Sequence, residues 1–325
     1  MRVVQALCVT LVLAIVGACD RLQSVFPPPT FDGAILVVEI DKEVTAELQL
    51  EAMSEQMAGA LRAAMIRYTG RGVRDGTVRI RLIDLADTER ALRELAPITG
   101  HMDITSTADG VIEGRLKDGF VDSAAADLAL QSIPILERRL GGARVAIEAG
   151  EAGRVLIRTT ADAVPESIKR MITQQGLVTF HMVREITAEA ESGLLPAGTM
   201  LVQPLFPDVR PEVVTRRPEF TGERLARANP STDPQTGEFV LSFQFDAEGA
   251  RRFCRITSEH TGQRFAILFD NQVMTAPTIN EPICGGSGQI SGNFTAESAN
   301  ELAIIMRAGA LPAPFRIVEE LPPAP

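Results

Sequence analysis

The chain has 325 residues, of which 45% are hydrophobic, enough for one large or two ordinary domains with packed cores. Its 42 Asp and Glu against 32 Lys and Arg give a net charge of -10, which repels phosphate backbones and excludes nucleic acid as an expected partner. Trp is absent and Tyr occurs once, so few aromatic side chains are available for stacking on bases or sugars.

Residues 1–19 predict an export signal or membrane anchor. Arg2 is followed by a mostly apolar run from Val3 to Ala18 and then by Cys19. As a helix this run would rise about 24 Å, less than the ~30 Å hydrocarbon core of a bilayer, which favours a cleaved signal. The quartet Val16–Cys19 resembles a bacterial lipobox, in which Cys19 would be the lipid-attachment residue. An uncleaved membrane anchor is the alternative, and both interpretations tether the rest of the chain outside the cytoplasm.

Residues 20–33 are Pro-rich and predict a stiff linker, and the pattern beyond them predicts an α+β base over residues 34–200. The order of strands and helices favours ferredoxin-like split β-α-β packing, in one copy or two. Pro134 is expected to kink or divide its helix. The expected elements are a strand at 34–40, a helix with an apolar face from Leu50 to Tyr68, a strand at 77–83, a helix at 86–95, two strands within 104–116, a helix at 122–140, a hairpin of 144–147 with 154–159, a helix at 165–173 and a strand at 177–182.

Prolines are dense and periodicity fades between residues 194 and 230, which places a linker at 201–221. Residues 222–312 predict an α/β head, a small sheet with helices on one face. Residues 313–325 are expected to be a return strand and tail, so that the head is inserted into the base. The expected head elements are strands at 239–245, 264–269, 273–279 and 289–292, a helix capped by Asp246, and a helix capped by Thr295 and ended by Gly309.

The sequence shows no signature of catalysis or metal binding. His101, His181 and His260 share no metal-like spacing with each other or with the four Cys, so we assign no metal, cofactor or catalytic residue. The loop Gly285–Gly288 could cradle an anion, but no Walker lysine follows it, and we interpret it as a conformational loop whose glycines adopt positive φ. We therefore expect a protein that works by contact with other proteins and is not an enzyme.

Two features of the head leave alternatives open. Cys254 and Cys284 would both be exported to an oxidising compartment and could form a disulfide, but Cys254 shares a helix face with Phe253 and could be buried as a thiol. Ile304 and Ile305 widen the apolar stripe of the last helix beyond one contact face. Either that helix is buried on two sides, or it exposes an apolar groove for unfolded polypeptide.

Long stretches of the predicted head resemble one known family, SecD, an accessory subunit of the bacterial Sec protein translocase. The stretches are F-D-A-E-G-A-R-R-F (Phe245–Phe253), A-I-L-F-D-N-Q-V-M-T-A-P-T-I (Ala266–Ile279), E-P-I-C-G-G-S-G-Q-I-S-G-N-F-T (Glu281–Thr295) and A-N-E-L-A-I-I-M-R-A-G-A-L-P-A-P (Ala299–Pro314). They closely resemble the head of the first periplasmic domain of SecD. The base resembles SecD more weakly, through the element order of residues 34–95 and the run Ile133–Leu140.

The chain also departs from the SecD pattern. The family's Leu-Gly-Leu-Asp-Leu-Arg-Gly-Gly signature is reduced to Phe31–Gly33, and its Leu-Pro-Gly is replaced by Arg158–Thr160. SecD continues into further membrane helices that house the proton-coupled machinery with SecF, whereas no run after Ala34 is long and apolar enough to span a bilayer. We therefore expect a SecD-like module without its own proton-coupling membrane part.

The resemblance implies a function in protein export at the periplasmic side of the bacterial inner membrane. Its partners would be unfolded secretory polypeptide, SecF and the Sec translocon. The Pro-rich segments 204–218 and 312–314 would act as hinges of the head. An envelope lipoprotein that uses the fold as a structural adaptor for another partner is the alternative. The head-motif residues that could contact polypeptide are Gly285, Gly286, Gly288, Asn293, Phe294, Ile304 and Ile305.

Overall fold

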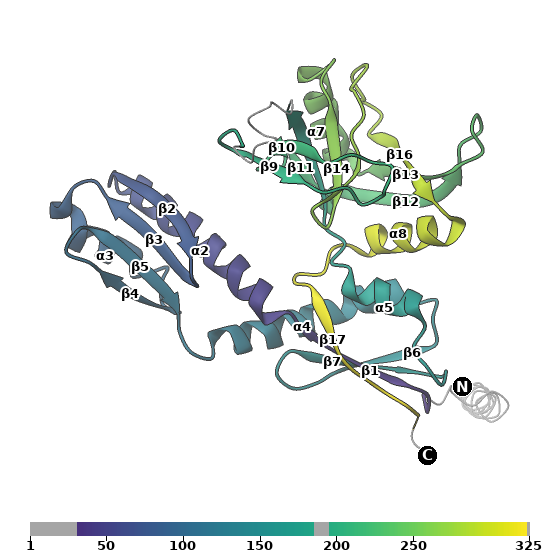
Figure 1. The fold of residues 1–325 in the computed structure, drawn as a ribbon, viewed down its shortest axis with the longest axis horizontal. Coiled ribbons are helices and arrows are strands. Elements are labelled where there is room, and N and C mark those ends of the chain that lie inside the picture. Colours follow the sequence, from purple (N-terminus) through teal and green to yellow (C-terminus); the bar gives the residue numbers. More distant parts are fainter. Residues whose placement is uncertain (1–30, 185–194, 324–325) are drawn as a thin grey trace, which may run out of the picture.

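The computed structural model describes residues 31–184 and 195–323, which form a base, a side domain and a head (Figure 1). The side domain (residues 42–116) and the head (residues 178–184 and 195–308) are both inserted into the base. The predicted signal or anchor and Cys19 lie outside the described residues. The base consists of β1 (Ile35–Ile40), α4 (Phe120–Leu140), β6 (Val145–Ala149), β7 (Arg154–Thr159), α5 (Glu166–Thr173) and β17 (Phe315–Leu321).

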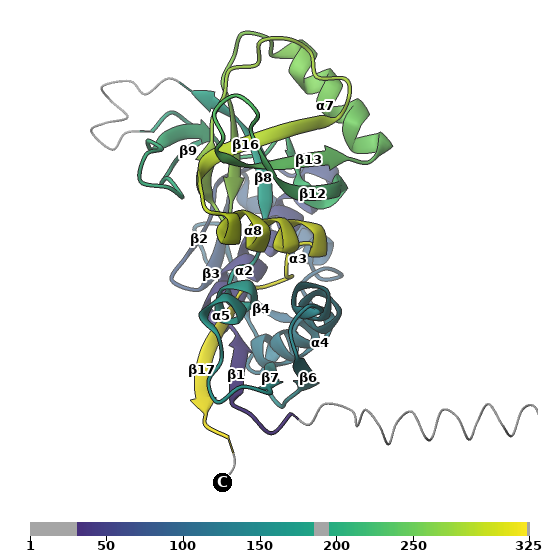
Figure 2. The same cartoon turned by 90° about the vertical axis from the view of Figure 1, so that its right-hand side faces the viewer.

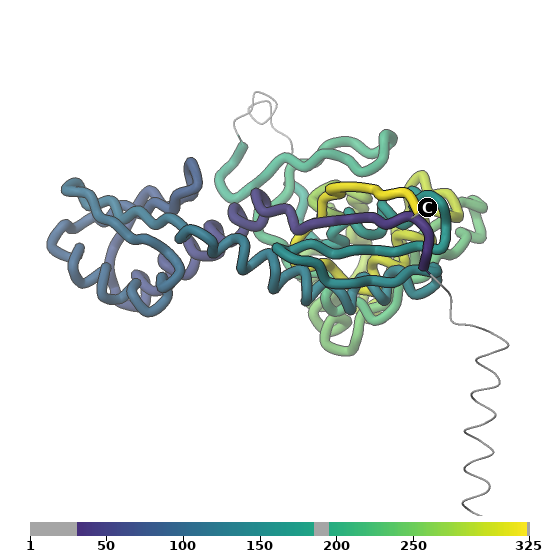
Figure 3. Tube along the Cα trace, turned by 90° about the horizontal axis from the view of Figure 1, so that it is seen from below, coloured from purple at the N-terminus to yellow at the C-terminus, as the bar shows by residue number. Residues whose placement is uncertain are grey.

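The base is a four-stranded antiparallel sheet with two helices on one face. Its strand order is β17-β1-β7-β6, and its elements follow along the chain in β-α-β-β-α-β order. Leu36, Val38 and Ile157 point inward and are buried in the core with side chains of α4 and α5. Figure 3 shows the opposite face, where the strands lie side by side. After the head, the chain enters the base sheet as β17, which pairs antiparallel with β1.

Pro134 lies inside α4 and does not divide it. A proline in a helix leaves the carbonyl four residues earlier without its donor. That carbonyl belongs to Leu130, and both Leu130 and Pro134 are exposed, so water can take the place of the missing donor. Of the two expected effects of Pro134, a kink or a division, division is wrong, because the break in the hydrogen-bond ladder lies on the solvent side of the helix.

The side domain is a second four-stranded antiparallel sheet, in the order β2-β3-β5-β4. It begins with α2 (Lys42–Ala63), whose N-cap Asp41 accepts hydrogen bonds from the backbone N–H groups of Glu43 and Val44 at 3.1 Å. Its core is separate from the core that the base and head share. The other elements are β2 (Tyr68–Arg74), β3 (Thr77–Leu82), η1 (Leu85–Asp87), α3 (Thr88–Leu95), β4 (Met102–Ser106) and β5 (Val111–Leu116).

The head contains two sheets with phenylalanine rings packed between them. Its helix α7 (Ala247–Glu259) starts at Asp246, which accepts a hydrogen bond from the Gly249 N–H at 2.7 Å. The first sheet has the order β15-β14-β8-β10-β9, with β11 also paired to β8, and comprises β8 (Val178–Arg184), β9 (Thr199–Val202), β10 (Glu212–Thr215), β11 (Phe220–Thr221), β14 (Phe265–Phe269) and β15 (Gln272–Thr275). The second comprises β12 (Leu225–Thr232), β13 (Phe239–Phe245) and β16 (Ser287–Phe294), with η2 (Gly222–Arg224) before β12. The packed rings are those of Phe180, Phe220, Phe243, Phe245, Phe253 and Phe265.

Helix α8 (Ala296–Ala308) lies between the head and the base (Figure 2). One side packs on β12, β13 and β16, and the other packs on α4 and α5. Ile305 is therefore fully buried and Ile304 is half-buried against the same core. Of the two alternatives left open for this helix, burial on two sides is the one present, because the base helices cover the apolar side that an exposed groove would need.

The boundary between base and head differs from the expected one. β8 pairs with β14 and β10, so residues 178–184 and 195–221, expected in the base and the linker, lie in the head. The segment 204–218 is not a hinge, because its strand β10 is hydrogen-bonded on both edges, to β8 and β9. The chain crosses between base and head at residues 174–177 and 309–314. In residues 31–184 and 195–323, no helix combines the length and the apolar character needed to cross a membrane.

A cavity in the side-domain core should destabilise the side domain alone, because that core is separate. Leu61→Ala removes a fully buried side chain and should cost about 2–5 kcal/mol. Hydrogen exchange read by mass spectrometry should show lost protection within residues 42–116 and unchanged protection in β13. Leu48→Ala, an exposed position on the same helix, is the control and should change neither region. Equal loss of protection in the head would contradict the independence of the two cores.

Candidate functional site

A groove with a volume of about 540 Å³ opens in the head where β16 ends beside the edge strand β15. We call it the head groove. Two of the residues that the resemblance implied, Asn293 and Phe294, line it, and Gly285, Gly286, Gly288, Ile304 and Ile305 do not. Its lining residues are Asp208, Val209, Glu238, Phe239, Met274, Thr275, Ser291, Gly292, Asn293 and Phe294.

The strand β16 has unpaired main-chain positions in this groove. Val240 on β13 pairs with Ser291 and Phe239 pairs with Phe294, so the two residues between them on β16, Gly292 and Asn293, have no partner on β13. Such a bulge leaves backbone groups outside the ladder. β16 is also the last strand of its sheet in the described residues, so its outer edge has no ladder partner there, and β15 contacts part of it.

The wall of the groove is aromatic and closely packed. Phe239 is 39% exposed, and it is the one phenylalanine among the exposed large apolar side chains of the described residues. Phe294 is buried and packs edge-on against Phe206, with ring centroids 5.0 Å apart. A Cβ atom at Gly292 would lie 2.9 Å from the Phe206 ring, so glycine is required for the backbone to approach it. The bulge is thus held in place by these rings, while Phe239 remains available for contact.

The groove is acidic. Asp208 and Glu238 are the charged residues in its lining, and both are exposed. Neither forms an ion pair with any residue that the structure describes. The groove therefore presents an exposed ring, free main-chain groups and two uncompensated carboxylates.

The glycine loop before β16 has a structural role in the head. Gly286 has a φ of 67°, and a Cβ atom there would lie 2.4 Å from Ala250 on α7. Gly288 does not need positive φ, but a Cβ atom there would meet the ring of Phe243 at 2.6 Å. Glycine is therefore required at both positions by close approach, and the expected positive φ holds at Gly286 alone among the glycines of this loop.

Cys254 on α7 and Cys284 before the loop form a disulfide, with their Cα atoms 4.3 Å apart. The Ile283 N–H also donates to the Thr257 hydroxyl at 2.9 Å. The first of the two open alternatives for these cysteines is thus the one present in the structure. The disulfide fastens the segment that leads into β16 to α7 and so constrains the strand that carries the groove.

The junction between base and head is organised by Arg139, which is 2% exposed on α4. Its guanidinium donates to the carbonyls of Gln174 and Gln175 in the first crossing, at 2.5 and 2.7 Å, and to Gly309 in the return crossing, at 2.9 Å. A fourth bond, of 2.9 Å, reaches the Met171 carbonyl at the end of α5. One buried side chain therefore holds both crossings against the base.

Asp270, in the turn after β14, binds the same junction from the head side. It accepts a hydrogen bond from the Leu177 N–H at 2.7 Å. Burial raises the pKa of Asp270, although backbone hydrogen bonds and the charge of Arg139 oppose the rise. Burial lowers the pKa of Arg139 to about 10, against the opposing charge of Asp270, so Arg139 stays protonated at neutral pH.

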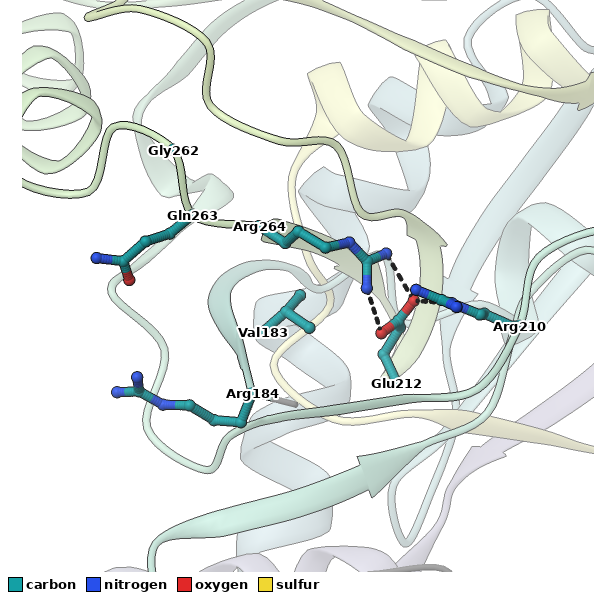
Figure 4. Close-up of a pocket in the computed structure, with 7 residues that line it drawn as sticks. All are labelled: Val183, Arg184, Arg210, Glu212, Gly262, Gln263 and Arg264. Carbon is teal, nitrogen blue, oxygen red and sulfur yellow. Dashed lines mark hydrogen bonds and ion pairs between the residues drawn. The ribbon is translucent and has the colours of Figure 1, made fainter. Parts of the chain in front are cut away.

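A second pocket in the head, of about 610 Å³, is shown in Figure 4. Glu212 is buried there and accepts two hydrogen bonds from Arg264, at 2.7 and 2.9 Å, and one from Arg210 at 3.0 Å. Burial alone would raise the pKa of Glu212, but the hydrogen bonds and charges of the two arginines outweigh it and lower the pKa. The carboxylate is thus fully paired, and we interpret this cluster as an ion pair that holds the sheet.

His181 is the buried histidine of the head. Its Nδ1 lies 2.7 Å from the Thr215 carbonyl and its Nε2 lies 2.9 Å from the Thr179 hydroxyl. Burial lowers its pKa from 6.5, with the Thr215 carbonyl opposing. In the residues that the structure describes, no group of three His, Cys, Asp or Glu side chains is placed to hold a metal ion.

The stability of the head should fall on acidification because of His181. The pKa of His181 in the folded chain lies below 6.5. Between that pKa and about pH 6.5, the unfolded chain binds a proton at this histidine and the folded chain does not. The free energy of unfolding should drop by up to about 1.4 kcal/mol per pH unit until the folded pKa is reached. Urea unfolding between pH 7.5 and pH 5 should show this fall, and His181→Gln should remove that share of it. An unchanged slope in the variant would contradict the assignment.

Removing the Arg139 guanidinium should loosen the junction. Arg139→Met leaves four carbonyl acceptors without their donor and should cost roughly 3 kcal/mol or more in the free energy of unfolding. Arg138→Met is the matched control: Arg138 is the exposed neighbour, donates to the Ala308 carbonyl alone, and should cost about 1 kcal/mol or less. Similar losses in the two variants, measured by urea unfolding, would sink the idea that Arg139 organises the junction.

Comparison with known proteins identifies the relatives of the chain. Residues 201–313 match the family model "SecDF, P1 head subdomain". The chain is 32% identical over 299 residues to protein translocase subunit SecD of Rickettsia felis and 33% identical over 298 residues to that of Acetobacter pasteurianus, covering in each case 89% of this chain and 57% of the relative. It thus spans little more than half the length of these relatives.

Among solved structures, SecDF in its super-membrane-facing form is similar over 60% of this chain and 28% of that one, with 27% identity and a TM-score of 0.49. The head groove lies within the matched residues 201–313. With the match to the P1 head subdomain and the similarity to SecD along 89% of the chain, the resemblance to the periplasmic domain of SecD is confirmed.

Proposed function

We propose that this chain is a SecD-like extracytoplasmic module that assists Sec-dependent protein export by contacting translocating, unfolded polypeptide with its head groove. The observation that carries the proposal is the meeting of the unpaired segment Gly292–Asn293 with the exposed ring of Phe239 in one groove. An unfolded chain offers free main-chain groups and apolar side chains. In this groove the unpaired segment Gly292–Asn293 can bind the former, and the exposed ring of Phe239 can contact the latter.

The proposal also concerns the partners and the location of the chain, which are taken from the relatives named as protein translocase subunit SecD. These relatives are longer than this chain. Its partners would be SecF and the Sec translocon. Tethering through Cys19, or through an uncleaved anchor at residues 1–19, would hold it at the periplasmic side of the inner membrane. It would work by contact and not by catalysis.

The architecture supports a head that is presented by a firm base. The β-α-β-β-α-β order with the sheet order β17-β1-β7-β6 favours a ferredoxin-like unit for the base. The crossings at residues 174–177 and 309–314 are the covalent links between this unit and the head. Movement of the head would therefore pivot at the carbonyls that Arg139 binds.

Co-purification tests the proposed contact. The tagged chain, isolated from membranes that hold a stalled secretory precursor, should recover the precursor together with the translocon. Phe239→Ala should lower precursor recovery at least about threefold, the scale of a lost apolar contact. Leu201→Ala removes a comparably exposed apolar side chain on β9 of the head and should leave recovery unchanged. Failure to recover either precursor or translocon, or equal losses in the two variants, would count against the proposal.

A further inference from the structure

The head groove has features that select among unfolded segments. We infer that it binds extended segments in which an apolar side chain is flanked by Lys or Arg, and that it binds them by adding a strand to the open edge of β16. This inference rests on the proposed contact with unfolded polypeptide and names the part of the polypeptide that is contacted.

Strand addition follows from the main chain of β16. An extended peptide pairs with an exposed sheet edge through backbone hydrogen bonds, which carry no sequence preference. The bulge leaves Gly292 and Asn293 without partners on β13, and residues 291–294 all line the groove beside the outer edge of β16. The main chain therefore supplies binding that any extended segment can use.

The apolar requirement follows from Phe239. Side chains alternate between the two faces of a strand, so a peptide on β16 directs every second side chain to one side. On β13, Phe239 lies directly opposite Phe294 of β16. Its exposed ring lies in the groove lining and offers an apolar contact for one side chain.

The basic requirement follows from Asp208 and Glu238. Both carboxylates line the groove, no Lys or Arg lines it, and neither carboxylate is paired with a residue that the structure describes. A Lys or Arg on either side of the apolar residue would meet an opposite charge, whereas Asp or Glu would be repelled.

Peptide binding to the full chain tests the inference. Fluorescence anisotropy would compare a labelled short peptide with Lys on both sides of alternating Phe and Leu, its twin with Glu in place of Lys, and a twin with N-methylated amides on alternate residues. The Lys peptide should bind roughly tenfold more tightly than the Glu peptide at low salt, and the preference should shrink in high salt because exposed charges are screened. The N-methylated peptide should bind at least about tenfold more weakly, because it cannot donate to the edge of β16.

Variants that each remove one carboxylate test whether Asp208 and Glu238 cause the preference for the Lys peptide. Asp208→Asn and Glu238→Gln should each weaken the Lys peptide about two- to fivefold, the scale of one exposed ion pair, and leave the Glu peptide no weaker. Glu259→Gln, at an exposed position of α7 outside the groove, is the matched control and should have no effect. All three side chains are exposed, so the variants should fold, which circular dichroism would verify.

The possible outcomes separate the inference from the function it rests on. If no peptide binds, the proposed contact with polypeptide is overturned together with the inference. If the Lys and Glu peptides bind equally well, the proposed contact with polypeptide is retained, and the preference for segments with Lys or Arg is ruled out. If N-methylation has no effect while binding is retained, strand addition to β16 falls.

Discussion

The arrangement of this molecule depends on one buried guanidinium at the junction of base and head. Arg139 is the largest of the fully buried side chains in the described residues, and it donates hydrogen bonds to backbone carbonyls of both crossings. Burying such a charge is costly unless its donors are satisfied, and here the acceptors come from segments far apart in the sequence. The four hydrogen bonds of its two Nη atoms can therefore form only when α5, the first crossing and the return crossing are all in place, while its Nε–H has no partner among the described residues.

The position of α8 follows from this junction. With both crossings held against α4, the helix that precedes the return crossing is confined between the base helices and the three-stranded sheet of the head. Its apolar residues, Ile305 among them, become part of a core that base and head share. The candidate contact surface consequently lies elsewhere in the head, at the bulged end of β16, where no element of the base takes part in the lining.

Local patterns were enough to predict most elements, and long-range pairing accounts for those that they missed. Capping at Asp246 and Thr295 and the alternation of residues 239–245 are local signals, and the structure has α7, α8 and β13 at these places. β2 was missed because Gly70 and Gly72 interrupt its alternation, and β9 to β12 were missed because they lie in a Pro-rich stretch. Strands of this kind are stabilised by partners distant in the chain, which a local pattern does not contain.

The candidate site was predictable only in part for the same reason. Asn293 and Phe294 were implied by the family resemblance, whereas Phe239, Asp208 and Glu238 were not foreseen. Phe239, Asp208 and Glu238 come together only through the pairing register of β13 with β16 and the position of the loop before β10. Both are features of the tertiary structure. The one local hint was Gly292 within a strand pattern, since an isolated glycine there is typical of a bulge.

Site-specific photocrosslinking during translocation tests the central claim most directly. A photoreactive residue would be placed in turn at Phe239 and Asn293 in the head groove, at Glu259 on α7 and at Leu156 on the open face of the base sheet. The account predicts that an arrested secretory chain crosslinks to positions 239 and 293 well above the other two. Crosslinks confined to positions 156 and 259, or equal at all four, would contradict it.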